Sequence, residues 1–340
     1  MKTRTATIAF CLAIASGVVI SLGAQQLSAG YQSQRIVDDA RKRPIHLDIW
    51  YPTAAQPEQP HRYGLSIGRV VPGGELAGER LPVVLLSHGA MGSATNYSWL
   101  AEHLARRGYV VLGVSHIGES PVFGADSLDP AAVGRFGDRT QDLNTALAYL
   151  LERSPFTARL DASRLAAIGH SSGGASALML AGVAFSASDL AAYCASDARA
   201  QDKGCQYPSS NDERAKQPPV APARRLRALV TLDPAVGPGF TERALRALSI
   251  STLVVGSVRN DFLPYASHAG RVGSQIPGAQ VVRLDRGEGH FVYVDECTLP
   301  IEVMGVRLCA DATGVDRKAV HETLAGSIEQ FLASALSSVR

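Results

Sequence analysis

The feature that most constrains this chain is the pentapeptide Gly-His-Ser-Ser-Gly at residues 169–173. Residues 165–168 before it form a short apolar run typical of a buried strand, and the small residues 172–181 favour a helix. A serine between glycines at such a junction fits the G-x-S-x-G turn, whose strained backbone lifts the serine above the sheet. The pattern predicts that Ser171 is an accessible nucleophile, with Ser172 one place past the tip of the turn.

Short apolar runs alternate with helical patterns along most of the chain, which predicts an α/β fold with a doubly wound, mostly parallel sheet. A length of 340 residues is compatible with one large domain over residues 30–340. A Pro- and Gly-rich stretch, residues 53–80, is expected to be a surface loop. The expected strands are 35–39 and 45–51, paired as a hairpin, followed by 81–86, 109–114, 165–168, 228–232, 252–255 and 279–284, and the clearest helices are 99–107, 140–151 and 172–181.

The alternation of strands and helices breaks between residues 185 and 225, where prolines and two cysteines gather. We expect this stretch to be a lid-like insertion beside the active site that is cross-linked by a disulfide.

The first two dozen residues are typical of a secretory signal. Lys2 and Arg4 precede an uncharged, mostly apolar run from Thr5 to Gln26. The alternative is an uncleaved membrane anchor, although the many small residues make the run weakly hydrophobic. We expect residues 1–24 to be removed, which predicts a secreted or periplasmic protein with no stable membrane insertion.

Four cysteines follow the predicted signal: Cys194, Cys205, Cys297 and Cys309. An even number in an exported chain indicates disulfides, and the two short-range pairs, 194 with 205 and 297 with 309, are expected. Free buried thiols are the alternative, and the spacing does not suit zinc. We expect no metal and no organic cofactor. With a net charge of +2 and interspersed charges, no nucleic-acid partner is expected.

A second motif, Ser-His-Gly-Ala at residues 87–90, follows the apolar run 81–86 directly. A loop in this position donates one backbone N–H to the oxyanion that forms when a serine attacks an acyl carbon, and the residue after the nucleophile donates the other. These donors are predicted to be Ala90 and Ser172. An ordinary turn after a strand is the alternative.

The general base is expected late in the chain, because the order in this fold is serine, acid, histidine. His290 follows the last expected strand and flexible glycines, whereas His268 and His321 fall on expected helices and are interpreted as surface or packing residues. His116, after the strand ending at 114, is either a pocket residue or a structural one.

The acid that orients His290 has two candidates. Asp233 follows the strand ending at residue 232, and Asp261 follows the next strand. The usual acid register, four residues before a proline, is held by Asn260 before Pro264, so Asp261 does not stand in it.

With these motifs, the chain resembles the platelet-activating-factor acetylhydrolase and predicted dienelactone hydrolase branch of the α/β-hydrolases, from Ile45 to the C-terminus. The acetylhydrolases of that branch take their acid after the earlier strand, so the resemblance favours Asp233 over Asp261. True dienelactone hydrolases use a cysteine nucleophile, whereas Ser171 stands here. The motifs are Trp50-Tyr51-Pro52, Leu86-Ser87-His88-Gly89, Gly169-His170-Ser171-Ser172-Gly173, Leu232-Asp233-Pro234 and Gly289-His290-Phe291.

These features together predict a serine hydrolase that cleaves carboxylic esters, of a short-chain acyl, lipid or polyester substrate, through an acyl-enzyme. A serine peptidase or amidase on the same fold is the first alternative. A catalytically inactive hydrolase fold used for binding is the second.

Overall fold

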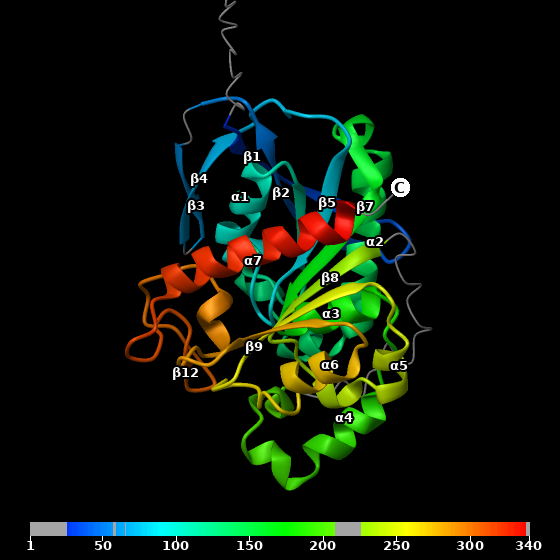
Figure 1. The fold of residues 1–340 in the computed structure, drawn as a ribbon, viewed down its shortest axis with the longest axis vertical. Coiled ribbons are helices and arrows are strands. Elements are labelled where there is room, and N and C mark those ends of the chain that lie inside the picture. The colour runs from blue at the N-terminus through cyan, green and yellow to red at the C-terminus, as the bar shows by residue number, and fades with distance from the viewer. Residues whose placement is uncertain (1–25, 57–58, 65, 208–225, 338–340) are drawn as a thin grey trace, which may run out of the picture.

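A ten-stranded sheet in the order β10-β9-β8-β7-β5-β6-β2-β1-β4-β3 forms the centre of the molecule (Figure 1). The computed structural model describes residues 26–56, 59–64, 66–207 and 226–337. The sheet strands are β1 Ser28–Asp38, β2 Arg43–Thr53, β3 Gln59–Tyr63, β4 Ser66–Pro72, β5 Leu81–Ser87, β6 Val110–His116, β7 Leu160–His170, β8 Leu226–Leu232, β9 Ser251–Ser257 and β10 Gln280–Leu284, and β11 Glu302–Val303 pairs with β12 Val306–Arg307 outside it. The helices are α1 Ser98–Arg106, α2 Phe136–Glu152, α3 Ser172–Leu180, α4 Ala187–Cys194, α5 Glu242–Arg246, α6 Ala269–Gln275 and α7 Arg317–Ser337.

The six strands from β10 to β6 in this order run parallel to one another. Every residue of β5 and β6 is buried, as expected for strands covered on both faces. The hairpin of β1 and β2 continues the sheet in antiparallel register. The carboxyl ends of β5, β7, β8, β9 and β10 therefore meet at one edge, where the loops that follow them can form a site.

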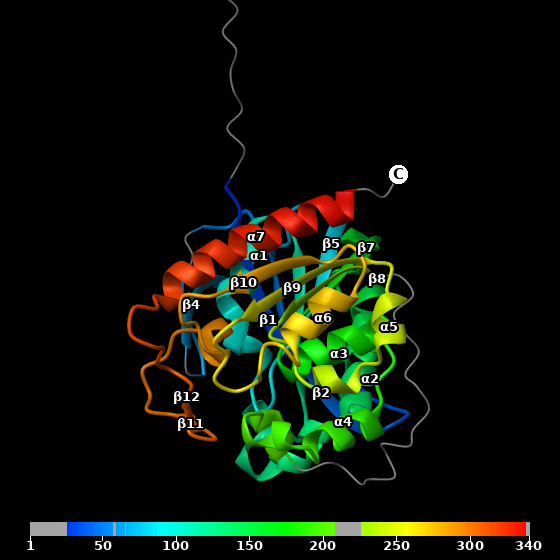
Figure 2. The same cartoon turned by 60° about the horizontal axis from the view of Figure 1, so that its bottom comes forward.

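Helices cover both faces of the sheet. α1 and α7 pack on one face, and α2, α3 and α6 lie on the other, as the rotated view shows (Figure 2). Each face has its own apolar core, one including Leu100 and Ile328 and the other including Leu178 and Val272. The α/β-hydrolase fold expected from the sequence is confirmed.

The loop expected over residues 53–80 is wrong in part, because β3 and β4 form an antiparallel pair there. The backbone N–H of Arg69 donates to the carboxylate of Glu102 on α1, at 3.1 Å from each oxygen. A Cβ at residue 68 would overlap that carboxylate, so Gly68 permits the approach. Glycine is needed here for close packing against a helix and does not mark a flexible loop.

Both expected disulfides are confirmed: Cys194 pairs with Cys205, and Cys297 with Cys309. The first closes a loop from Cys194 to Cys205 within the part of the expected insertion that the structure describes, residues 185–207, which contains α4. The rest of that insertion and the predicted signal at 1–24 lie outside the described residues.

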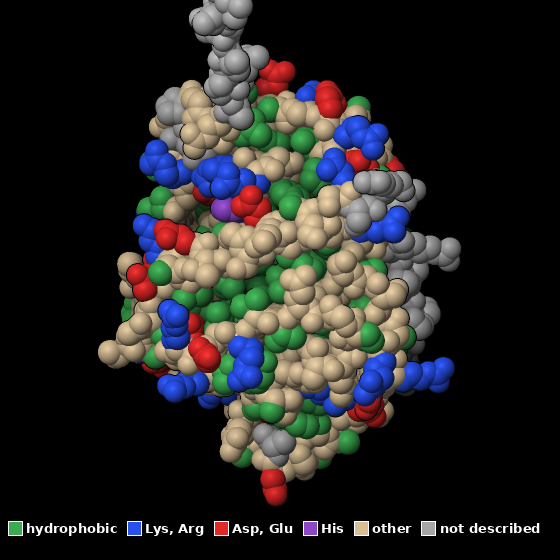
Figure 3. Space-filling view, viewed as in Figure 1, with side chains coloured by type: hydrophobic (Ala, Val, Ile, Leu, Met, Phe, Trp, Pro, Cys, Tyr) green, Lys and Arg blue, Asp and Glu red, His purple; other side chains and the backbone are tan. Residues whose placement is uncertain are grey.

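None of the helices described is long and apolar enough to span a membrane. On the face seen in Figure 3, basic and acidic side chains are interspersed.

Candidate active site

Ser171 lies at the junction of β7 and α3, in the turn that the sequence predicts. Its φ of 54° lies in the left-handed region, where a non-glycine residue is strained. The turn is held from both sides: the Ser171 N–H donates to the Leu232 carbonyl at 3.0 Å, and the Ser171 carbonyl accepts from the Ala235 N–H at 2.9 Å. A Cβ on Gly169 or Gly173 would overlap neighbouring backbone, so both positions require glycine.

His290 meets Ser171 from the loop after β10. Its Nε2 lies 2.9 Å from the Ser171 Oγ, which is hydrogen-bond distance, and its side chain is 1% exposed. The Phe262 ring stacks on the imidazole, with centroids 5.1 Å apart and planes within 13°. The serine and histidine from the two sequence motifs, 119 residues apart, therefore share one hydrogen bond.

Asp233 and Asp261 both approach His290, but at different atoms. Asp233, at the end of β8, places its Oδ2 3.7 Å from the ring Nδ1. Asp261 instead accepts the backbone N–H of His290 at 2.8 Å. The geometry thus favours Asp233 as the partner of the ring, whereas Asp261 holds the loop that carries it. The Asn260 amide Nδ2 also lies 3.3 Å from Nδ1.

Burial is the largest influence on the pKa values of Asp233 and His290. It raises the pKa of Asp233 to about 7, against the lowering effect of hydrogen bonds from Ser257. Burial also lowers the pKa of His290 to about 3. Both shifts arise because burial disfavours the charged form of a side chain. The consequence for His290 is a neutral imidazole at neutral pH, which is the form a general base needs.

Ala90 and Ser172, the expected oxyanion donors, lie in the loop after β5 and at the start of α3. Ser172 is the first residue of α3, so its N–H belongs to the helix turn that lacks intrahelical acceptors. Ala90 follows Gly89, whose ideal Cβ position is 3.4 Å from the Ser171 Cβ. The loop after β5 therefore lies against the nucleophile, at the positive end of the α3 dipole.

A buried tyrosine joins three segments of the site. The Tyr97 hydroxyl accepts the Gly89 N–H at 3.0 Å and lies 2.7 Å from His170 Nδ1. His170 Nε2 lies 3.0 Å from the backbone carbonyl of His290. Since that carbonyl can only accept, Nε2 carries the proton and Tyr97 donates to Nδ1. The chain of bonds fixes the oxyanion loop, the nucleophile turn and the histidine loop relative to one another.

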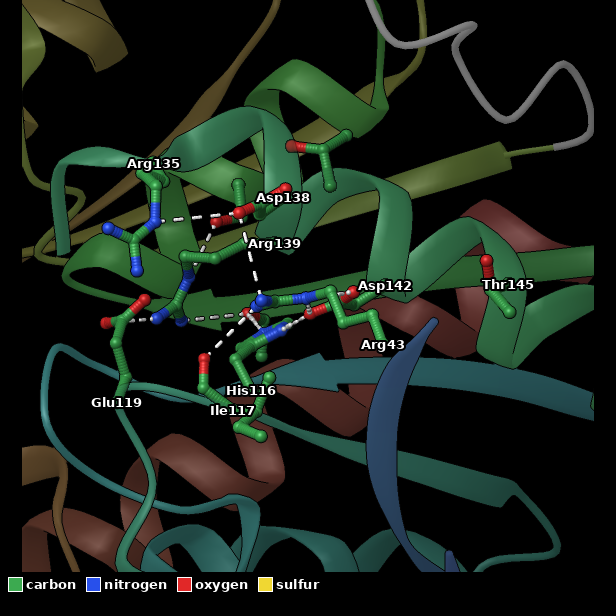
Figure 4. A network of polar contacts seen from close by, with 12 residues as sticks. Arg43, His116, Ile117, Glu119, Arg135, Asp138, Arg139, Asp142 and Thr145 are labelled. Carbon is green, nitrogen blue, oxygen red and sulfur yellow. Dashed lines mark hydrogen bonds and ion pairs between the residues drawn. The ribbon is translucent and has the colours of Figure 1, made fainter. Parts of the chain in front are cut away.

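Arg139 of α2, drawn beside Glu119 in Figure 4, contacts the same loop, and its side chain is fully buried. It donates to Glu119 at 2.7 Å, to the Ser176 hydroxyl at 3.0 Å and to the Ser87 hydroxyl at 3.2 Å. It also donates to the carbonyl of His88. One buried cation thus anchors both residues that precede Gly89.

His116 belongs to this network and is a structural residue. Its Nδ1 lies 3.0 Å from Asp142, and its Nε2 lies 3.2 Å from the Ser87 hydroxyl. Asp142 in turn accepts from Arg41 and Arg43 of the first hairpin. Figure 4 shows His116, Arg43 and Asp142 gathered beside α2. Burial and the nearby guanidinium of Arg139 hold the pKa of His116 well below its usual range.

The two other histidines weighed as bases have partners other than Ser171. His268 Nε2 lies 2.7 Å from Asp202 Oδ2, and His321 donates to the Val292 carbonyl at 2.7 Å. Both are buried packing residues. Within the residues described, no group of three or more His, Cys, Asp or Glu side chains is arranged to hold a metal ion.

Tyr97, Arg139 and Glu119 were not singled out by any sequence pattern, because their roles depend on contacts with residues far along the chain. Asn260 was visible as the occupant of the usual acid register. The sequence does not reveal that the amide of Asn260 contacts the ring of His290.

Comparison with known proteins bears on the fold. Residues 78–201 match the family model described as serine aminopeptidase, S33. Over most of its length the chain is similar to the solved structure of a ferulic acid esterase from Streptomyces cinnamoneus, with a TM-score of 0.62, 21% identity, and 94% of this chain and 93% of that chain covered. The protein therefore has the α/β-hydrolase fold.

Among curated proteins, Cutinase 1 of Thermobifida cellulosilytica is 35% identical over 100 residues, which are 29% of this chain and 33% of that protein. Cutinase est1 of Thermobifida alba is 24% identical over 198 residues, covering 58% of this chain and 48% of that protein. The chain thus spans between a third and a half of the length of these relatives.

Proposed function

We propose that this protein is an exported serine hydrolase that cleaves carboxylic esters through an acyl-enzyme. The observation that carries the proposal is the hydrogen bond of 2.9 Å between Ser171 Oγ and His290 Nε2, at a strained strand-to-helix turn. A hydroxyl becomes a useful nucleophile when a neutral imidazole removes its proton, and burial keeps this imidazole neutral.

The proposed reaction has two halves. Ser171 attacks the acyl carbon while His290 takes its proton, and the N–H groups of Ala90 and Ser172 stabilise the oxyanion. His290 then returns the proton to the leaving alkoxide. Water, activated by the same imidazole, attacks the acyl-enzyme and releases the acid. Asp233 is the acid that orients Nδ1 and stabilises the imidazolium.

An ester substrate is favoured over a peptide by the names of the relatives, which are cutinases and a ferulic acid esterase. The family model that matches residues 78–201 is described as a serine aminopeptidase, so amide cleavage is the second candidate. We place the protein outside the cytoplasm because of its two disulfides and the predicted signal at residues 1–24.

The test is a panel of p-nitrophenyl esters from acetate to palmitate beside aminoacyl p-nitroanilides, with wild-type protein and Ser171→Ala. We expect ester hydrolysis that Ser171→Ala abolishes. Anilide cleavage with rates above those of every ester would favour the aminopeptidase. If neither class is hydrolysed by the wild type, the fold serves another purpose.

A further inference from the structure

The amide of Asn260 has a fixed orientation in the site. Its Oδ1 accepts the backbone N–H of Phe262 at 2.9 Å and that of Leu263 at 2.7 Å. Only the oxygen of the amide can accept two N–H donors, so Nδ2 must be the atom on the other side. That nitrogen lies 3.3 Å from Nδ1 of His290 and carries hydrogens to donate.

A donor facing Nδ1 has a consequence for the tautomer of His290. If Nδ1 accepts from Asn260, the single ring proton of the neutral imidazole must sit on Nε2. Nε2–H then donates to Ser171 Oγ across the 2.9 Å contact. An imidazole in this tautomer has no lone pair toward the hydroxyl and cannot take its proton.

Asp233 requires the opposite tautomer. Its Oδ2 lies 3.7 Å from Nδ1, longer than a hydrogen bond, and has no hydrogen bond of normal geometry within the part of the chain that the structure describes, although the hydroxyls of Ser257 and Tyr293 interact with the carboxylate and lower its pKa. Its Oδ1 is occupied by the Ser257 N–H at 2.8 Å. A proton on Nδ1 would supply the missing partner of Oδ2 and leave Nε2 free to accept from Ser171.

We propose that Asn260 is a positioning residue that competes with Asp233 for Nδ1 of His290 and holds the resting enzyme in the tautomer with the proton on Nε2. The proposal rests on the catalytic roles given to Ser171 and His290 above. At the position where most enzymes of this fold carry the acid, an amide therefore stabilises the tautomer of His290 that cannot accept the Ser171 proton. We call this slowing of catalysis the brake.

Four proteins test this competition, because they present zero, one or two carboxylates to Nδ1. These are the wild type, Asp233→Asn, Asn260→Asp and the double variant that exchanges the two groups. Aspartate at 260 keeps an oxygen for the two backbone donors of the turn, so the fold is retained. The exchange preserves total charge and nearly preserves volume, which makes it the matched control for both single variants.

The expected values of kcat, each measured on the alkaline plateau with p-nitrophenyl butyrate, follow the number of carboxylates. Asp233→Asn falls by about 10⁴-fold. The double variant recovers to within about tenfold of wild type, because the carboxylate at 260 now accepts from Nδ1. Asn260→Asp exceeds wild type by about 2- to 10-fold, the range expected for one hydrogen bond. A double variant as inactive as Asp233→Asn would overturn the proposal and leave Asn260 a turn cap.

The ring ¹⁵N chemical shifts of His290 give a readout that does not depend on turnover, with His290→Gln used for assignment. The proton is expected on Nε2 in wild type and on Nδ1 in Asn260→Asp. A wild-type ring already protonated on Nδ1 would refute the brake even if the protein is an active esterase. The expected tautomer in a protein that hydrolyses no ester would instead refute the proposed function alone.

Discussion

Removing the Tyr97 hydroxyl should slow catalysis without touching any group that reacts. Tyr97→Phe leaves two buried polar atoms without a partner, the Gly89 N–H now held at 3.0 Å and the His170 Nδ1 now held at 2.7 Å. Each unsatisfied buried group costs about 1–3 kcal/mol, and partial relaxation puts the loss of unfolding free energy at about 2–4 kcal/mol. Full loss of an oxyanion donor costs about 10²–10³ in kcat, so a loosened loop that keeps its donor should cost about tenfold.

The assay compares Tyr97→Phe with Tyr63→Phe, in urea unfolding and in ester hydrolysis at a temperature where both are folded. Tyr63 also has a buried hydroxyl, which accepts from the Trp50 indole at 2.9 Å, but it lies on β3 away from the site. Both variants should lose stability, and only Tyr97→Phe should lose kcat, with KM nearly unchanged. Equal kcat for the two variants would refute the account of Tyr97 as the link between catalytic loops.

Three further changes test other parts of the structure. Gly173→Ala should prevent folding or abolish activity, because its Cβ would overlap backbone, whereas Gly137→Ala on α2 has open space and should stabilise by about 0.5–1 kcal/mol in urea unfolding. Replacing Cys297 and Cys309 together by serine should cost about 3 kcal/mol of unfolding free energy, since the disulfide closes a short loop in the unfolded chain; an unchanged midpoint would contradict this. Burial lowers the pKa of His321 to about 4, so the unfolded state binds a proton that the folded state does not between pH 6.5 and 4, and stability falls by about 3 kcal/mol over that window. His321→Gln should remove this share of the acid-induced loss, seen as a smaller difference between urea midpoints at pH 7 and pH 4.5.

Most strands and helices of the fold could be predicted from local sequence patterns. The apolar runs of β5, β6 and β8 were predicted within a residue or two, because strands buried on both faces need continuous apolar side chains. β3 and β4 were missed, because their residues read as a loop rich in proline and glycine. Close contacts with Glu102 on α1 and with the Tyr63 ring explain the glycine at position 68.

In the site, too, some residues could be predicted from local motifs, whereas others depend on contacts that only the structure shows. Ser171 and His290 stand in motifs whose glycines serve the local backbone, so the sequence alone could point to them. The choice between Asp233 and Asp261 depends on which atom of His290 each carboxylate reaches, and spacing cannot decide that. The role of Tyr97 could not be predicted for the same reason, since its hydroxyl joins Gly89 after β5 to His170 at the end of β7.

Covalent labelling tests the central claim most directly. Incubation with diisopropyl fluorophosphate followed by intact-protein and peptide mass spectrometry should show one phosphoryl adduct, located on Ser171. The rate of labelling should fall by at least about 10³-fold in His290→Ala, because the hydroxyl then lacks its base. A wild-type protein that stays unlabelled, or an adduct on another residue, would contradict the account.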